Sequence, residues 1–308
     1  MLETPVYPEV MPNITQSYGF PVREDILTTN HKGKPVTFFK TSQNVLTAVA
    51  PILRRVLEQD EVVYYATSAQ DPLPLILADA YTRISFIVTL VFTDRRLLVF
   101  NMTNGKANAG WRGNIQSLRW TEVTEFKGAG FAFGGNARFN LQGGAKPLCF
   151  TTRAIPKLKT FLPALIERAR SQGVRNEGCL SLCARCLKPL AAGVYTCANC
   201  GLVYKDESSL TKKLLLPGGP YFYAGMTTVG VVTAISQVIV LLLLLALVLL
   251  GGEADTLVTI FILAAAAIYA QVLAWFTARK MIRKHLPADM KQINMESTGI
   301  SSAPITPR

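Results

Sequence analysis

The sequence predicts an α+β domain with an antiparallel sheet, a small cysteine-rich module, and a hairpin of two apolar helices. Three observations lead to this fold class. Short segments with alternating apolar residues and Gly-rich turns fill residues 36–172, two Cys-x2-Cys pairs follow, and residues 224–278 are almost uninterrupted apolar sequence. At 308 residues, half of them hydrophobic, the chain has room for about two domains, and collagen, coiled-coil and wholly disordered classes are excluded.

The alternating segments of the first domain indicate short strands. They lie at residues 62–67, 86–92, 97–102, 115–127, 137–142 and 147–151. Turns are expected at Asn104-Gly105, whose residue types favour a hairpin, and in the Gly-rich stretches 128–135 and 143–144. Six or more short strands with tight connections predict an antiparallel meander that curls into a barrel or a sandwich.

A helix is expected after the last strand. Apolar residues recur at helical spacing from Leu158 to Ala169, and an internal proline, Pro163, predicts that the helix starts near Thr160. A second amphipathic helix is expected at residues 44–57, interrupted at Pro51. We interpret both apolar stripes as core packing rather than as faces for a partner.

Strands followed by one amphipathic helix resemble a pleckstrin-homology-like (PH-like) domain of the bacterial or GRAM-related type. The resemblance rests on LVFTDRRLLVF at 90–100, SLRW at 117–120 and VTEF at 123–126. It implies binding or assembly rather than catalysis. Because no run of Lys and Arg matches a phosphoinositide pocket, that ligand site is not carried over, although Arg95 and Arg96 are candidates for contact with lipid headgroups.

Two uncharged stretches, 227–250 and 256–278, predict transmembrane helices. The first has 24 residues and would form a helix of about 36 Å, enough to cross a hydrocarbon core of about 30 Å. Residues 251–255 supply an acidic turn without Lys or Arg, whereas basic residues flank both outer ends, so both termini and the main domains are expected in the cytoplasm. The alternative is a buried hairpin of a soluble protein.

Small residues at a spacing of four predict the contact between the two spans. Gly230 and Ala234 would face Ala270 and Ala274, with Ala266 continuing the second series, and two glutamines at similar depth are expected to hydrogen-bond: Gln237 and Gln271. The alternative is that the glutamines bind neighbouring subunits.

Four cysteines in two Cys-x2-Cys pairs predict a metal site: Cys183, Cys186, Cys197 and Cys200. Two such pairs can surround a tetrahedral Zn²⁺, and four thiolates leave no open position, so the zinc is expected to be structural. Gly193 and Gly201 supply flexible positions for the turns. A disulfide pairing is the alternative, disfavoured on the reducing side of a membrane. No role is assigned to Cys149 or Cys179.

The domain boundaries follow from these features. We expect a flexible N-terminal segment (1–35), the PH-like domain (36–172) and a zinc ribbon (178–210). An interfacial linker (211–226), the two membrane helices (227–250 and 256–278) and a flexible C-terminal tail (287–308) follow. With the sequence PGGPYFYAG at 217–225, this arrangement is similar to a group of uncharacterised bacterial membrane proteins.

The function expected is a non-enzymatic adaptor in the inner (cytoplasmic) membrane, which binds protein partners or itself. The formal net charge is +12, and residues 1–223 carry 26 basic and 16 acidic side chains, so a reader of anionic lipid or, less so, of nucleic acid is the alternative. Gly128-Ala-Gly-Phe-Ala-Phe133 lacks the third glycine of a dinucleotide-binding loop, and only two histidines occur. We therefore expect no small-molecule substrate and no catalytic residues.

Overall fold

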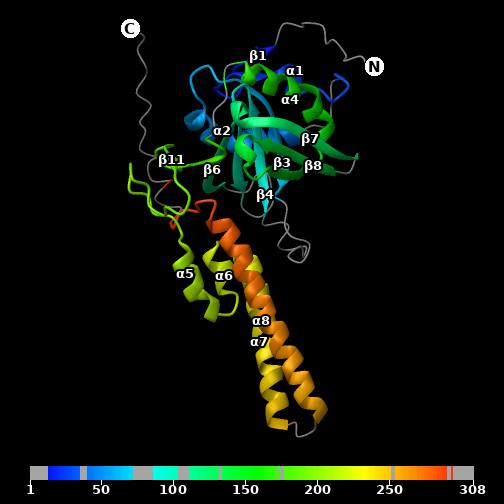
Figure 1. Cartoon of the computed structure of the whole chain (residues 1–308), viewed down its shortest axis with the longest axis vertical. Helices are drawn as coiled ribbons and strands as arrows, with labels where there is room; N and C mark the ends of the chain where they lie inside the picture. The colour runs from blue at the N-terminus through cyan, green and yellow to red at the C-terminus, as the bar shows by residue number, and fades with distance from the viewer. Residues whose placement is uncertain are drawn as a thin grey trace. The chain divides into compact units, whose positions relative to one another are not determined.

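The computed structural model describes residues 13–34, 40–71, 86–102, 111–131, 134–171, 173, 177–250, 254–289 and 293. The chain divides into two compact units. Unit 1 comprises Met1–Pro72, Ile87–Trp111 and Ser117–Leu180 and holds most of the sheet (Figure 1). Unit 2 comprises Leu73–Phe86, Arg112–Gln116 and Ser181–Arg308 and holds the paired cysteines and the apolar helices.

The sheet is built from neighbouring strands in the order β6-β5-β4-β3-β9-β8-β7. Pairing is antiparallel between β3 and β4, β4 and β5, β3 and β9, β9 and β8, and β8 and β7. The strands are β3 (Val63–Gln70), β4 (Ile87–Thr93), β5 (Arg96–Met102), β6 (Trp111–Arg119), β7 (Val123–Phe131), β8 (Gly134–Leu141) and β9 (Leu148–Thr152). The antiparallel sheet is confirmed, but it is not closed, so the structure does not confirm the predicted PH-like barrel.

Two of the predicted strand boundaries are wrong. The predicted strand 115–127 is interrupted by a 3-10 turn, η2 (Trp120–Glu122), where the buried Trp120 donates from Nε1 to the carbonyl oxygen of Thr93 at 2.9 Å. The Gly-rich stretch at 128–135 is mostly strand, with Gly130 opposite Gly135. A Cβ atom on Gly130 would lie 2.2 Å from the Cα of Gly135, so the glycines permit this close pairing while hiding the alternation that identifies a strand.

The helix after β9 is α4 (Ile155–Arg170), which packs on β7, β8 and η2. It starts five residues before the predicted Thr160, because Pro156 stands in the first turn, where a missing N–H costs no hydrogen bond. Pro163 lies inside the helix. The buried residues of α4 are Ile155 and the six residues of the predicted apolar stripe: Leu158, Phe161, Leu162, Leu165, Ile166 and Ala169.

Helix α2 (Lys40–Val56) packs on β3 and contains Pro51. Before it, the segment 1–35 that we predicted to be flexible holds β1 (Ile14–Thr15), β2 (Val22–Arg23) and α1 (Glu24–Leu27). Strand β2 pairs with β3 in parallel. The predicted turn at 104–105 lies outside the described residues, as does nearly all of the C-terminal tail.

Unit 2 contains a short β-hairpin followed by helices (Figure 1). Strands β10 (Leu180–Leu182) and β11 (Pro189–Leu190) pair antiparallel. Then follow α5 (Glu207–Lys212), the 3-10 turn η4 (Lys213–Leu215), α6 (Gly219–Tyr223), α7 (Thr227–Leu250) and α8 (Ala254–Ile282).

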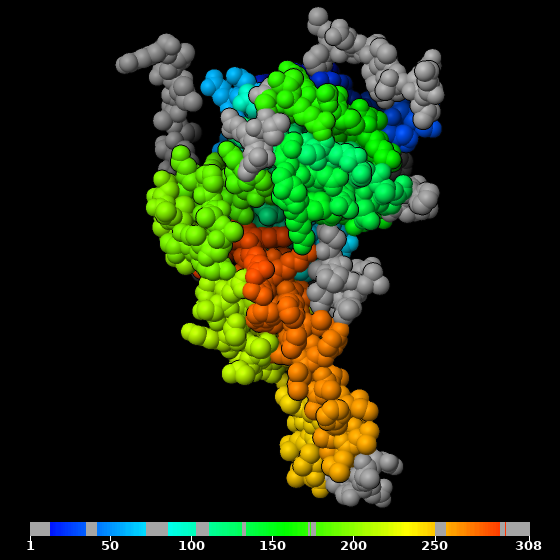
Figure 2. All heavy atoms as spheres, in the orientation of Figure 1, coloured from blue at the N-terminus to red at the C-terminus, as the bar shows by residue number. Residues whose placement is uncertain are grey.

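Helices α7 and α8 are long and apolar enough to cross a membrane, over 23 and 26 residues. The most apolar window of α7 has no buried residue, unlike a core helix of a soluble protein. In the view of Figure 2, no other described element of unit 2 covers the yellow and orange atoms at the far ends of α7 and α8. The predicted pair of apolar helices is therefore confirmed, with α8 extending four residues beyond the predicted end.

The predicted contact between these helices is partly wrong. Gln237 donates from Nε2 to Oε1 of Gln271 at 2.5 Å, as predicted, and Ala274 is fully buried. Ala266 and Ala270, however, are exposed. Gly230 faces α6, because a Cβ atom there would lie 2.8 Å from the ring of Phe222. The α6 segment takes the place that the spacing of small residues assigned to α8.

Candidate metal centre

Four thiols converge in unit 2 as the sequence predicted. The Sγ atoms of Cys183 and Cys200 lie 3.5 Å apart, as do those of Cys186 and Cys197, and all four lie within 4.8 Å of one another. A tetrahedral Zn²⁺ with bonds of about 2.3 Å places its sulfur ligands about 3.8 Å apart. The cysteines are not joined by disulfides, so the cluster has the donors and the size for a metal ion.

The two Cys-x2-Cys turns have the same backbone geometry. In the first, the amide of Leu187 donates to the carbonyl oxygen of Cys183 at 2.9 Å; in the second, Gly201 donates to Cys197 at the same distance. The residue that follows the second cysteine has a positive φ in each turn, 60° at Leu187 and 71° at Gly201. The predicted role of Gly201 is confirmed, whereas Leu187 adopts a conformation unfavourable for a residue with a side chain.

Backbone amides and burial shift the pKa values of the thiols in opposite directions. Burial raises the pKa of Cys183, and burial together with hydrogen bonds from the Cys200 thiol to the sulfurs of the other three cysteines raises the pKa of Cys200 to about 12. At Cys186 burial is outweighed by the backbone amide of Lys188 and by neighbouring side chains, which lower its pKa to about 7. Amides directed at sulfur favour the thiolate, the form that binds metal.

Tyr204 supports the cluster from behind. Its side chain is 2% exposed, and its hydroxyl accepts a hydrogen bond from the amide of Ala184 at 3.1 Å and forms another with Cys183. No sequence motif predicts this role of Tyr204. Since the ring is buried, it does not offer the exposed aromatic surface on which nucleic-acid bases stack.

The segment after α8 completes the module. The amide of Lys205 donates to the carbonyl oxygen of Leu286 at 2.8 Å, that of Ala288 donates to Val203 at 3.0 Å, and Tyr204 and Pro287 form a β-bridge. The ring of His285 meets that of Tyr204 edge to face at 5.7 Å, and its Nε2 lies 3.2 Å from the carbonyl oxygen of Ala191. We call residues 181–205 and 285–288 the cysteine module.

The two other cysteines take no part in the cluster. Cys149 lies in β9, Cys179 lies just before β10, and neither belongs to the group of ligand atoms.

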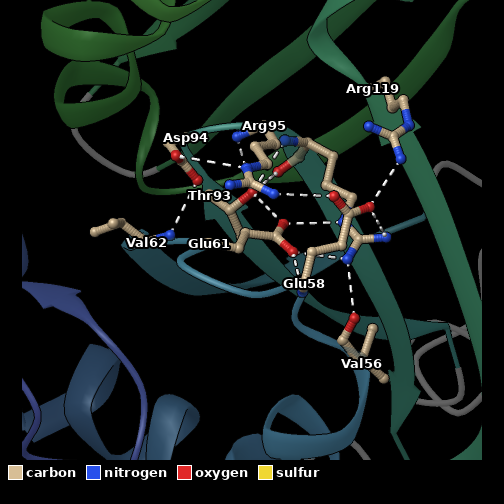
Figure 3. Close-up of polar contacts among 9 residues, drawn as sticks. Val56, Glu58, Glu61, Val62, Thr93, Asp94, Arg95 and Arg119 are labelled. Carbon is tan, nitrogen blue, oxygen red and sulfur yellow. Dashed lines mark hydrogen bonds and ion pairs between the residues drawn. The ribbon is translucent and has the colours of Figure 1, made fainter.

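A second polar cluster lies in unit 1, at the turn between β4 and β5 (Figure 3). Arg96, whose side chain is 7% exposed, binds Glu61 through Nε at 2.9 Å and through a terminal nitrogen at 2.7 Å. Arg95 and Arg119 both bind Glu58, at 3.2 and 2.8 Å. Although partial burial opposes it, these arginines lower the pKa of Glu58.

This charged cluster contains Arg95 and Arg96, the two candidates for contact with lipid headgroups. Arg96 forms an ion pair with the fully buried carboxylate of Glu61. Arg95 and Arg119 form ion pairs with the same carboxylate, that of Glu58. Three arginines meet three carboxylates, counting Asp94 beside Arg95. The arrangement is therefore a balanced ion network that fixes the turn.

Comparisons with known proteins add no family assignment. No protein-family model, no curated protein and no solved structure matches this sequence. The interpretation of the site therefore depends on its own geometry.

Proposed function

We propose that the four cysteines bind one structural Zn²⁺ and that the cysteine module is a zinc ribbon. Two matched turns that direct four sulfurs to one point support this proposal. Four protein ligands fill a tetrahedral shell and leave no position for a substrate or an activated water. A segment this small has little core of its own, so the metal would supply much of its folding free energy.

We further propose that the protein is a non-enzymatic adaptor anchored by two spans, α7 and α8, in the inner membrane of a bacterium, with its termini and both larger parts in the cytoplasm. The observation that carries this proposal is the pair of helices long and apolar enough to cross a membrane. The pairing of residues 203–205 with 286–288 joins the cysteine module to the segments that precede and follow these helices. Unit 1, proposed to be PH-like, then presents its surface to protein partners or to a second copy of this chain.

Metal content tests the zinc proposal directly. The purified full chain should contain one zinc per molecule by elemental analysis, and Cys197→Ser/Cys200→Ser should contain less than a tenth of that amount. Cys149→Ser, which changes a cysteine outside the cluster, should retain full zinc. Zinc in the double variant equal to that of the parent would exclude these ligands.

Two further experiments test the adaptor proposal. In sealed inside-out vesicles, protease should remove unit 1 and the cysteine module; protection of both would reverse the proposed orientation. Affinity purification from gently solubilised membranes should then recover a partner, or a second copy, that stays bound at raised salt. Binding that is instead only to anionic lipid or oligonucleotide and falls steeply with salt would favour the alternative, a charge-driven reader.

A further inference from the structure

A short helical segment folds back along the apolar hairpin. Helices α5 and α6 lie beside the start of α7 and the end of α8 (Figure 1). We call the connection between α5 and α6, with the last residue of α5, the tip loop (residues 212–218). At the other end of α5, Glu207 pairs with Arg279 at 2.6 Å and with Arg283 at 2.7 Å.

The glutamine pair of the two long helices holds the tip loop. The amide of Gly218 donates to Oε1 of Gln237 at 2.8 Å. Nε2 of Gln271 donates to the carbonyl oxygens of Leu214 and Leu216, the latter at 3.0 Å. The alternative role for these glutamines, contact with neighbouring subunits, is thus replaced by contacts within the chain, and the tip loop is fixed at their level.

The position of the glutamines leaves a short apolar hairpin beyond the tip loop. Residues 238–250 of α7 extend about 20 Å and residues 254–270 of α8 about 25 Å, at a rise of about 1.5 Å per residue. A bilayer hydrocarbon core is about 30 Å thick. If the acidic turn at 251–255 marks the far boundary, the near boundary lies about 5 to 10 Å behind the tip loop, so the tip loop is inside the core.

The aromatic residues agree with this boundary. Trp275 lies four residues beyond Gln271 on α8, about 6 Å nearer the cytoplasmic end of the helix. Its Nε1 lies 3.4 Å from Oγ1 of Thr211, which is exposed on α5. Trp is common at the headgroup level, where an apolar ring with one polar atom is favoured.

The side chains of the tip loop fit this position. Leu215 is 89% exposed and Leu216 is 52% exposed, so both present apolar surface that the described residues of unit 2 leave uncovered. Lys212 and Lys213 are exposed beside them. Long lysine side chains can extend from the edge of the apolar region to the headgroups, and near a membrane surface they favour anionic lipids.

We propose that the tip loop inserts into the near leaflet, with Leu215 and Leu216 among the acyl chains and Lys212 and Lys213 bound to anionic lipid phosphates. This inference rests on the proposed membrane anchor and adds a third, non-spanning contact with the bilayer. The hairpin, its glutamine pair and the tip loop then insert into the bilayer together. The hydrogen bonds from the tip loop to Gln237 and Gln271 determine how deep the tip loop lies.

Depth-dependent fluorescence quenching tests the insertion. The full chain is reconstituted in phosphatidylcholine–phosphatidylglycerol vesicles that contain lipid brominated near the top or near the end of the acyl chain. The emission of each introduced tryptophan is obtained by subtracting the emission of the parent chain. The emission of Leu215→Trp should be quenched more by bromine near the top of the acyl chain, and that of Leu242→Trp more by bromine near its end. Val194→Trp, a 41% exposed site on the cysteine module, should be quenched only by aqueous acrylamide.

The outcomes separate this inference from the membrane anchor. If Leu242→Trp is quenched by bromolipid but Leu215→Trp responds only to acrylamide, the tip loop lies in water and the inference is wrong. If neither is quenched by bromolipid, the membrane anchor itself fails. If Leu215→Trp is shielded from both quenchers, protein covers the tip loop, which overturns the lipid contact in favour of a second chain.

Lipid selectivity tests the two lysines. Near an anionic surface each lysine contributes a factor of about five in affinity, so Lys212→Gln/Lys213→Gln should lower the preference for spin-labelled phosphatidylglycerol over phosphatidylcholine about 25-fold. Lys127→Gln, on a 61% exposed lysine of β7, is the matched control and should leave the preference unchanged. An unchanged preference in the double variant would exclude the phosphate contact.

Discussion

Replacing Gly201 by alanine should weaken metal binding through the backbone alone. The residue has φ 71°, and a Cβ atom placed on it would meet no atom within 4 Å, so a methyl group fits without a clash. The remaining cost is that of the left-handed conformation, about 1–2 kcal/mol for a residue with a side chain. Because we propose that metal binding supplies much of the folding free energy of the module, we expect Gly201→Ala to bind Zn²⁺ about 5- to 30-fold more weakly.

The assay is competition for Zn²⁺ between the detergent-solubilised chain and a chromophoric chelator at fixed pH. Leu187→Gly is the reciprocal variant, since Leu187 has φ 60° at the equivalent position and glycine relieves that strain at an entropic cost of about 0.5–1 kcal/mol. The net gain is therefore about 0 to 1.5 kcal/mol, and the zinc affinity of Leu187→Gly should lie between that of the parent and about 13-fold above it. Gly173→Ala, at φ 106° in unit 1, should leave zinc affinity unchanged. Equal affinity of Gly201→Ala and the parent, or an equal loss in Gly173→Ala, would refute the reasoning.

Three further changes test the contacts around the two clusters and in α5. Tyr204→Phe leaves the buried amide of Ala184 without its acceptor, so the module should lose about 1–3 kcal/mol and release zinc to a chelator faster; an unchanged release rate would contradict this. Arg96→Met leaves the fully buried Glu61 unpaired, which should destabilise unit 1 by about 3–5 kcal/mol in thermal or urea unfolding, whereas Arg96→Met/Glu61→Gln should recover most of the loss. Asp206→Ala removes the N-cap of α5, which should cost about 1 kcal/mol. Amides of the first turn lower the pKa of Asp206 to about 2, so the stability it contributes is complete above its ordinary value near 3.8 and is lost as pH falls toward 2; the alanine variant should lack this dependence, and an identical acid transition in both would exclude it.

The sequence was most informative where one chemical requirement controls the pattern. Two Cys-x2-Cys pairs identified the four thiols, and uncharged stretches identified α7 and α8, because metal ligands and membrane spans each tolerate few alternatives. The helix after β9 also followed from its apolar spacing.

The errors arose where a contact with another segment determines the structure. Gly130 and Gly135 are typical of a turn when read locally, yet they are paired across β7 and β8. The small residue Gly230 signals a close approach without naming the neighbour, which is α6. Tyr204 has no motif that marks it as a support for the thiols, because its role depends on the fold of residues around it.

The pairing of residues 203–205 with 286–288 has a consequence for biogenesis. The strand partner of the cysteine module is synthesised only after both long helices, since it follows α8 in the chain. The cysteine module therefore forms its last backbone hydrogen bonds only after the second helix has left the ribosome. These bonds then join the segment that precedes the two helices to the segment that follows them. A chain truncated after α8 would contain all four thiols and both helices but lack these hydrogen bonds.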